Sequence, residues 1–151
     1  MGKTALIQQY VHSIFSDKYL STVGVKISKK ELSVDSRDVT LVLWDMEGKD
    51  VYVDINIAYL RGAMGYFLVA DGLRAETLKA ALELRDIAVN LVGDLVPHYI
   101  LLNKADVEEE WEITEEQIDG LRARGITVLK TSAKTGLGVE EAFLGLSKAM
   151  L

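Results

Sequence analysis

The chain begins with residues typical of the second half of a phosphate-binding loop. Gly2, Lys3 and Thr4 match the end of the pattern G-x-x-x-x-G-K-[ST]. In that pattern backbone N–H groups and the lysine hold phosphates, and the hydroxyl binds Mg²⁺. The first glycine of the pattern and the strand that normally precedes it are not in this sequence. Three matching residues occur by chance in many chains, so the motif needs support from the rest of the sequence.

A second group of residues follows the apolar run at residues 39–44. Asp45 at the end of this run can hold a metal ion through water, and the N–H of Gly48 can face a phosphate. The D-x-x-G pattern by itself is more often a simple turn that ends a strand. It therefore gains weight only in combination with other motifs.

Two further polar groups follow apolar runs in the second half of the chain. Asp106 can accept two hydrogen bonds from the N1–H and exocyclic amine of guanine, which adenine cannot supply. A polar loop is an equally good explanation of residues 103–106 taken alone. Residues 131–136 follow the last apolar run, and a backbone N–H there can bind the guanine O6. The alternative for this segment is a capped turn that leads into the last helix.

The elements that must position these residues alternate along the chain. Apolar runs predict strands at residues 23–34, 39–44, 66–70, 99–102 and 126–129. Helical spacing and a Thr114/Gln117 capping box predict helices at residues 5–14, 75–91, 114–125 and 139–150, with a weaker one at 50–62. The first two strands read as an antiparallel hairpin around a polar turn at residues 35–38, and the charged residues 29–31 indicate an exposed edge.

This order predicts an α/β fold: a mostly parallel sheet with one antiparallel edge strand and helices on both faces. Ligands of such sheets bind beyond the carboxyl ends of the strands, which is where the polar groups lie. We expect a single domain that spans residues 1–151.

Composition excludes several other classes of protein. A net charge of −6 argues against a nucleic-acid partner, and the absence of cysteine excludes disulfides, thiolate zinc sites and prenylation. With 49% hydrophobic residues and one proline, the chain is expected to fold. We expect a cytoplasmic protein without a lipid anchor in this chain.

Together the motifs resemble the Ras superfamily of small GTPases over essentially the whole chain. The matching segments have the order and spacing of that family: Gly2-Lys3-Thr4, Thr22-Val23-Gly24, Trp44-Asp45-x-x-Gly48, Asn103-Lys104-x-Asp106 and Thr131-Ser132-Ala133-Lys134. Residues 59–65 look Rab-like. The resemblance implies a P-loop G domain that binds GTP or GDP with Mg²⁺ and acts as a switch with effector or regulatory partners.

The resemblance also implies roles for the phosphate-side residues. Lys3, within the Gly2-Lys3-Thr4 motif, would contact the β- and γ-phosphates. Thr4, Thr22 and Asp45 would bind Mg²⁺, Asp45 through water. Gly48 would donate its N–H to the γ-phosphate. The resemblance implies that the catalytic residues are Thr22, Gly48 and Lys49.

On the base side, Asp106 would bind the guanine, and the Ala133 N–H would donate to O6. Asn103 would tie the base loops together, while Lys104 would pack along the base. Ser132 and Lys134 belong to the same motif. Phe15 aligns with an aromatic residue that packs on the guanine, or it is a core residue at the end of the first helix.

Two residues depart from the family pattern near the γ-phosphate. Lys49 stands where the family usually has the glutamine that orients the attacking water, and lysine has no acceptor for that purpose. We therefore expect slow hydrolysis. Glu47 replaces a small residue, and its charge is expected to favour GDP over GTP.

The incomplete phosphate loop is the third departure. The strand before it would be central in this fold, with neighbours on both sides. Either the sequence begins inside a longer protein, or the domain is truncated and a partner's strand completes it. A guanine-nucleotide switch with weak GTPase activity remains the first hypothesis. The alternative is a nucleotide-free or non-hydrolysing pseudo-GTPase that acts as a protein-interaction module.

Overall fold

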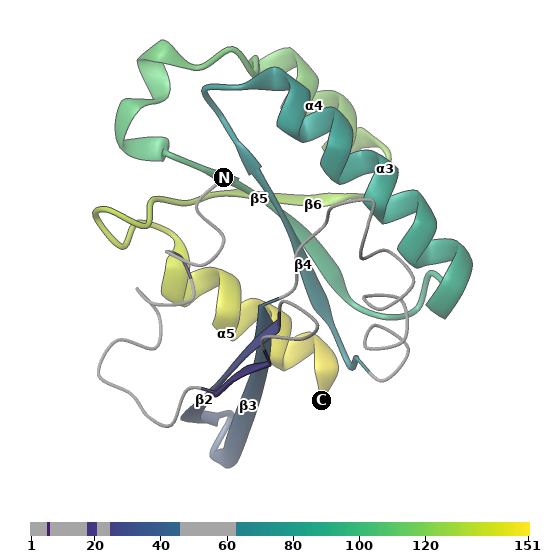
Figure 1. Ribbon diagram of the computed structural model, residues 1–151, viewed down its shortest axis with the longest axis vertical. Helices are drawn as coiled ribbons and strands as arrows, with labels where there is room; N and C mark the ends of the chain where they lie inside the picture. Colours follow the sequence, from purple (N-terminus) through teal and green to yellow (C-terminus); the bar gives the residue numbers. More distant parts are fainter. Residues whose placement is uncertain (1–5, 7–17, 21–24, 46–62) are drawn as a thin grey trace.

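A computed structural model describes residues 6, 18–20, 25–45 and 63–151, with side chains at residues 6, 30–41 and 63–151 (Figure 1). The elements in chain order are β1 (Lys18–Leu20), β2 (Val25–Val34), β3 (Arg37–Asp45), β4 (Tyr66–Asp71), α3 (Ala75–Val92), β5 (His98–Asn103), the 3₁₀ helix η2 (Ala105–Glu110), α4 (Glu115–Ala123), β6 (Thr127–Lys130) and α5 (Val139–Met150). The predicted helices at residues 5–14 and 50–62 lie outside the described residues, apart from Leu6, which is helical and buried.

The strands form two sheets of three strands each within the described part of the chain. One is parallel with the order β4-β5-β6, and the other is antiparallel with the order β1-β2-β3. The α/β class and the parallel and antiparallel strands agree with the sequence prediction, but a single sheet was expected. Among the described residues, no strand joins β3 to β4 by hydrogen bonds.

The predicted hairpin is present, with a tighter turn than expected. Val34 pairs with Arg37, so only Asp35 and Ser36 form the connection. Both have positive φ, 49° and 68°, as a two-residue hairpin turn requires. β1, which the sequence did not predict, pairs only with the first three residues of β2. Residues 29–31 therefore have a described strand partner on one side only, as expected of an edge.

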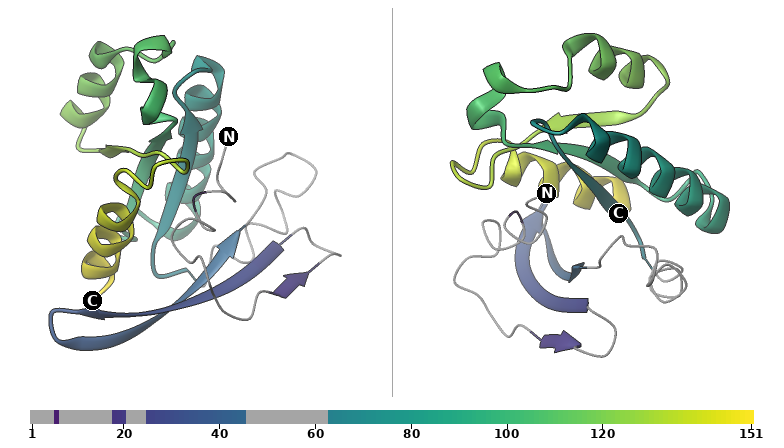
Figure 2. Two further views of the ribbon diagram at one scale, coloured as in Figure 1. Left: turned by 90° about the vertical axis from the view of Figure 1, so that its left-hand side faces the viewer. Right: turned by 45° about the horizontal axis from the view of Figure 1, so that its top comes forward.

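The parallel sheet is covered by helices on both faces, as predicted. Alternate residues of its strands face opposite sides: Val69 and Leu101 pack in a cluster with Phe143 of α5. Their neighbours Ala70 and Ile100 pack in a second cluster with residues of α3 and α4. Figures 1 and 2 show α3 and α4 on one side of β4–β6 and α5 on the other. The hairpin adds Leu41 to the α5 cluster and so joins the two sheets through apolar contacts.

Local sequence signals set the ends of α3 and α4. α4 begins at a complete capping box, in which the Thr114 hydroxyl accepts from Gln117 N–H at 3.2 Å and the Gln117 side chain accepts from Thr114 N–H at 2.9 Å. α3 ends at Gly93, whose φ of 90° suits glycine and whose N–H donates to Val89 C=O at 2.9 Å. None of the helices in the described ranges combines the length and apolar composition that crossing a bilayer requires.

Candidate functional site

The carboxyl ends of β4, β5 and β6 bring three polar residues to one edge of the parallel sheet. Asp71 and Asn103 are the last residues of β4 and β5, and Thr131 follows β6. Their side chains are almost completely buried, with exposed fractions of 1%, 3% and 0%. The large majority of buried polar groups in proteins are hydrogen-bonded, because an unpaired one is costly. Their partners therefore reveal how the loops at this edge are held.

Asn103 connects the two loops that the sequence assigned to base recognition. Its Oδ1 accepts a hydrogen bond from the Ala133 N–H at 3.1 Å and a longer one from the Thr131 hydroxyl at 3.5 Å. The main chains are also joined, because Ala105 N–H donates to Thr131 C=O at 2.9 Å. The predicted role of Asn103 in tying these loops together agrees with this geometry.

Asp106 lies in the same group and is oriented by a serine from the other loop. The Ser132 hydroxyl donates to Asp106 Oδ1 at 2.8 Å and accepts from the Thr135 N–H at 3.1 Å. Asp106 is exposed, whereas Ser132 is fully buried. A buried serine thus fixes one carboxylate oxygen of an aspartate that reaches the surface. The second oxygen, Oδ2, makes no hydrogen bond within the described part of the chain.

Lys104 adopts a conformation that only a few residue types favour. Its φ is 75°, in the left-handed region. The indole N–H of Trp111 donates to the Lys104 C=O at 2.8 Å, which holds this conformation. Its ammonium group donates to Asp71 Oδ2 at 2.7 Å. The stem of Lys104 therefore runs across the site between Asp71 and the loop that contains Asp106.

Asp71 is held in its charged form by its surroundings. Burial raises the pKa of its carboxyl group, but hydrogen bonds from Lys104 and from the Leu73 N–H outweigh burial, so the pKa lies below its usual value. Its backbone is fixed as well, because Asp71 N–H donates to the Thr77 hydroxyl at 2.8 Å. Asp71 therefore presents a fixed negative charge to Lys104.

Gly72 allows the segment after η2 to cross the end of β4. A Cβ at this position would lie 2.0 Å from Cε2 of the Trp111 ring, far inside van der Waals contact. Gly72 C=O also accepts from Glu112 N–H at 3.0 Å, and Gly72 N–H donates to Asn103 C=O at 3.1 Å. The glycine is required here by close approach and not by an unusual φ.

A basic residue next to this edge joins η2 to α4. Lys130, the last residue of β6, donates to Glu108 at 2.5 Å and also to Glu115. These two carboxylates raise the pKa of the Lys130 ammonium group. The two ion pairs of Lys130 hold the segment that contains Trp111 between η2 and α4. Exposed ion pairs of this type contribute only modestly to stability.

The phosphate-side residues predicted from the sequence are not brought together by the described residues. Those that lie outside the described ranges are Gly2, Lys3, Thr4, Thr22, Gly48 and Lys49, and the base-side prediction Phe15 lies outside them as well. Asp45 ends β3, but only its backbone is described. The predicted Mg²⁺ ligands therefore stay a prediction. Within the described ranges no three His, Cys, Asp or Glu side chains gather in a group that could hold a metal.

The base-side residues differ in whether their hydrogen-bonding groups are free or already paired. Lys134 is exposed, and Asp106 has an available oxygen. The Ala133 N–H, predicted to bind O6, already donates to Asn103. Binding of O6 there requires this hydrogen bond to be shared or exchanged. Asp106 therefore has a carboxylate oxygen free of hydrogen bonds to the described residues, whereas the Ala133 N–H is already engaged.

Sequence reasoning missed Asp71, Gly72, Thr77 and Trp111. Asp71 had a usable signal, because it follows an apolar strand in the same way as Asn103. Trp111 and Gly72 had none, since their contact joins segments far apart in the sequence.

Comparisons with known proteins bear on the whole chain. A sequence model described as the Ras family matches residues 1–151. The chain is similar to Ras-related protein Rab-13 of Bos taurus, with 33% identity over 153 residues that cover 100% of this chain and 75% of the relative. It is 35% identical to Ras-related protein Rab-32 of Mus musculus, over 100% of this chain and 71% of the relative. Identity to Ras-related protein Rab-7a of Dictyostelium discoideum is 33%, over 98% of this chain and 76% of the relative.

Proposed function

Because the chain belongs to the Ras family of small GTPases, we propose that it is a guanine-nucleotide-binding switch with slow GTP hydrolysis. The observation that carries this proposal is the Asp106–Ser132 hydrogen bond of 2.8 Å. It holds a carboxylate at the surface with one oxygen directed by a buried serine. Guanine presents two donors, N1–H and the exocyclic amine, to such a carboxylate.

The surroundings of Asp106 support the same proposal. Asn103 and the backbone of Ala105 bind the loop that contains Ala133, so the base-binding edge is ordered before any ligand arrives. Preorganised groups of this kind bind without the cost of ordering. Adenine offers an acceptor at N1 and no amine at C2, so Asp106 would repel it.

The proposal includes a phosphate side that the sequence motif supplies. Lys3 would bind the phosphates, and Thr4, Thr22 and Asp45 would hold Mg²⁺, which neutralises phosphate charge when bound. Lys49 provides donors but no acceptor for the attacking water, so hydrolysis is slow. Single-turnover hydrolysis of GTP bound to the full chain measures this rate. A rate equal to that of family members with glutamine at this position contradicts the slow-hydrolysis part of the proposal.

Nucleotide selectivity tests the role of Asp106. GDP and IDP differ only in the exocyclic amine, and a charge-assisted hydrogen bond contributes about 1.5–3 kcal/mol. We expect the unmodified chain to bind GDP about 10- to 100-fold more tightly than IDP. In Asp106→Ala this preference should disappear. Asp119→Ala removes an exposed aspartate from α4 and should leave the preference unchanged.

A second candidate function is supported by the departures from the family pattern. Glu47 and Lys49 favour a pseudo-GTPase that binds proteins without hydrolysing nucleotide. Chromatography of any nucleotide released by denaturing the purified chain separates the two. Stoichiometric GDP or GTP supports the switch, whereas no released nucleotide and no measurable GDP binding support the interaction module. For either function we propose a cytoplasmic location and protein effectors or regulators as partners.

A further inference from the structure

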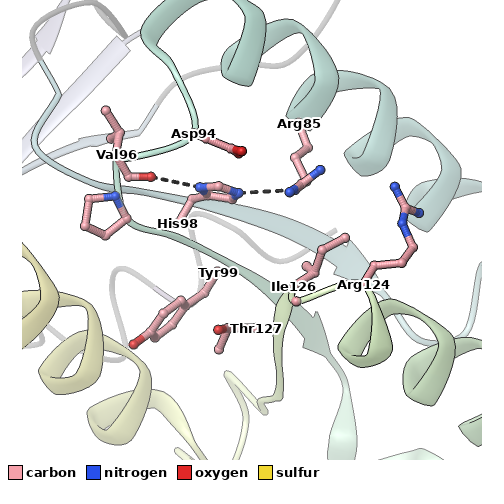
Figure 3. Close-up of a pocket in the computed structure, with 10 residues that line it drawn as sticks. Arg85, Asp94, Val96, His98, Tyr99, Arg124, Ile126 and Thr127 are labelled. Atoms are coloured by element: carbon pink, nitrogen blue, oxygen red, sulfur yellow. Dashed lines mark hydrogen bonds between the residues drawn. The ribbon is translucent and has the colours of Figure 1, made fainter.

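A cavity of about 390 Å³ lies at the amino ends of β5 and β6, away from the base-binding edge at their carboxyl ends (Figure 3). It is bounded by α3, by the segment that leads into β5 and by the residues that follow α4. Its charged lining residues are Arg85, Asp94 and Arg124. The cavity therefore has a net lining charge of about +1 when His98 is neutral, in a chain whose overall charge is −6.

Arg85 is oriented by a histidine whose tautomer the geometry determines. Arg85 Nε–H donates to His98 Nε2 at 3.2 Å, and a guanidinium can only donate. His98 Nε2 must therefore accept, so the ring proton is on Nδ1 and donates to Val96 C=O at 2.9 Å. The His98 ring is held further by stacking on Tyr66, with centroids 4.9 Å apart. This arrangement holds Arg85 through Nε and leaves its terminal nitrogens without a hydrogen bond or ion pair to the residues that the structure describes.

Arg124 contrasts with its neighbour Arg122 on the same helix end. Arg122 donates from Nη2 to Val128 C=O at 2.9 Å, which explains it as a structural residue. The Arg124 side chain makes no ion pair or hydrogen bond to the residues that the structure describes. Figure 3 shows Arg85 and Arg124 extending from facing helices to the same side of the cavity. Two positively charged side chains therefore line one cavity.

Asp94 does not neutralise this pair. It lines the cavity, but no ion pair joins it to Arg85 or Arg124. In the view of Figure 3 it lies beyond Arg85 on the side away from Arg124. Its carboxylate lowers the affinity of the cavity for anions without filling the space between the two guanidinium groups.

We propose that this cavity binds a phosphate group between Arg85 and Arg124. A guanidinium presents paired N–H donors that match phosphate oxygens, and a tetrahedral anion can meet two such groups from different directions. The Thr127 hydroxyl lines the same cavity and offers one more donor. The volume leaves room for the molecule that carries the phosphate. This site is separate from the proposed nucleotide site and does not depend on it.

The test is a titration of the full chain with inorganic phosphate at constant ionic strength, followed by heteronuclear NMR. We expect saturable shifts of the Gly125 and Thr127 amides, with a midpoint on the order of 1 mM for so small a probe. Arg124→Gln should raise the midpoint at least about tenfold, and Arg85→Gln should do the same. Asp94→Asn should lower it about threefold, because it removes the opposing charge. A spectrum with native dispersion verifies that each variant is folded.

Arg74→Gln is the matched control for loss of one positive charge. Arg74 pairs with Glu76 at 3.4 Å at the start of α3, away from the cavity, so its removal should leave the midpoint unchanged. Shifts that grow linearly without saturation overturn the proposal. Equal midpoints in the unmodified chain, Arg124→Gln and Arg74→Gln overturn it as well. A short phosphoserine peptide that binds more tightly than inorganic phosphate would favour a phosphorylated polypeptide as the source, and a peptide that binds more weakly would favour a phosphorylated small molecule.

Discussion

Polar side chains lie at both the carboxyl and the amino ends of the β4–β5–β6 sheet, but the two ends differ in how completely those side chains are hydrogen-bonded. At the carboxyl end, Asp71 and Ser132 are buried and each is hydrogen-bonded to a partner from another segment. At the amino end, the Tyr66 hydroxyl is buried without a hydrogen-bond partner, and the Arg124 guanidinium has none among the described residues. The carboxyl end is thus a nearly complete network, whereas the amino end has unused bonding capacity.

The two ends of the sheet are therefore expected to bind ligands in different ways. A completed network fixes the few groups that remain available, such as Asp106 Oδ2, and so favours selectivity. An incomplete network leaves charged groups that a ligand itself must satisfy. Selectivity is therefore expected at the carboxyl end, and weaker charge-driven binding at the amino end.

The largest expected effect comes from filling the close approach at the carboxyl end. In Gly72→Ala the new Cβ would lie 2.0 Å from the Trp111 ring, so either the ring or β4 must move. We expect a loss of about 2–4 kcal/mol in the free energy of unfolding, measured by urea denaturation. Gly120→Ala is the control, because nothing lies within 4 Å of the added Cβ on α4.

A double variant shows whether the loss comes from this contact. Adding Trp111→Ala to Gly72→Ala removes the clash, so the two substitutions together should cost less than the sum of their separate effects. Additive losses would mean that Gly72 is needed for another reason. The close contact between Gly72 and Trp111 would then not be the reason that this end of the sheet requires glycine.

The second effect concerns the buried charge of Asp71. Asp71→Asn keeps the size of the side chain but removes the ion pair with Lys104. We expect a loss of about 1.5–3 kcal/mol near pH 7. The folded-state pKa of Asp71 is lowered, so its contribution is present above the unfolded value near 3.8 and is lost as pH falls through the folded value. The difference from the unmodified chain should therefore shrink on acidification below about pH 4.

Urea denaturation of both proteins between pH 7 and pH 3 measures this dependence. Asp119→Asn, at an exposed position of α4, is the control and should show little difference at any pH. A constant difference across the range would show that the charge of Asp71 is not what stabilises this end of the sheet.

Much of this fold follows from local sequence signals. The start of α4 was predictable because the Thr114/Gln117 capping box acts within one turn, and both ends of α5 matched its apolar periodicity. Apolar runs likewise located β4, β5 and β6 to within about one residue. The polar residues after these strands could then be assigned to one edge from the rule for parallel sheets.

The remaining features depend on contacts between distant segments. η2 is an acidic segment with no helical apolar period, and Lys130 from β6 holds it through Glu108. A short stretch of sequence cannot predict the contact of Trp111 with Gly72, because these residues are far apart in the chain. The same holds for the Arg85–His98 hydrogen bond. The two-sheet arrangement also could not be read from periodicity, because alternation within a strand does not say which strands pair.

The smallest expected effect tests the amino end directly. The Tyr66 hydroxyl is buried without a hydrogen-bond partner, and burial raises its pKa. Removing an unsatisfied buried hydroxyl should be neutral or stabilising, so we expect Tyr66→Phe to change the free energy of unfolding by between 0 and about +1 kcal/mol. The ring and its stacking on His98 are kept, so Arg85 should remain in place. Urea denaturation of Tyr66→Phe beside Asp71→Asn compares the two ends of the sheet in one experiment. A loss of more than about 1 kcal/mol in Tyr66→Phe would show that the hydroxyl is satisfied in solution, and the contrast between a complete and an incomplete network would then fail at this position.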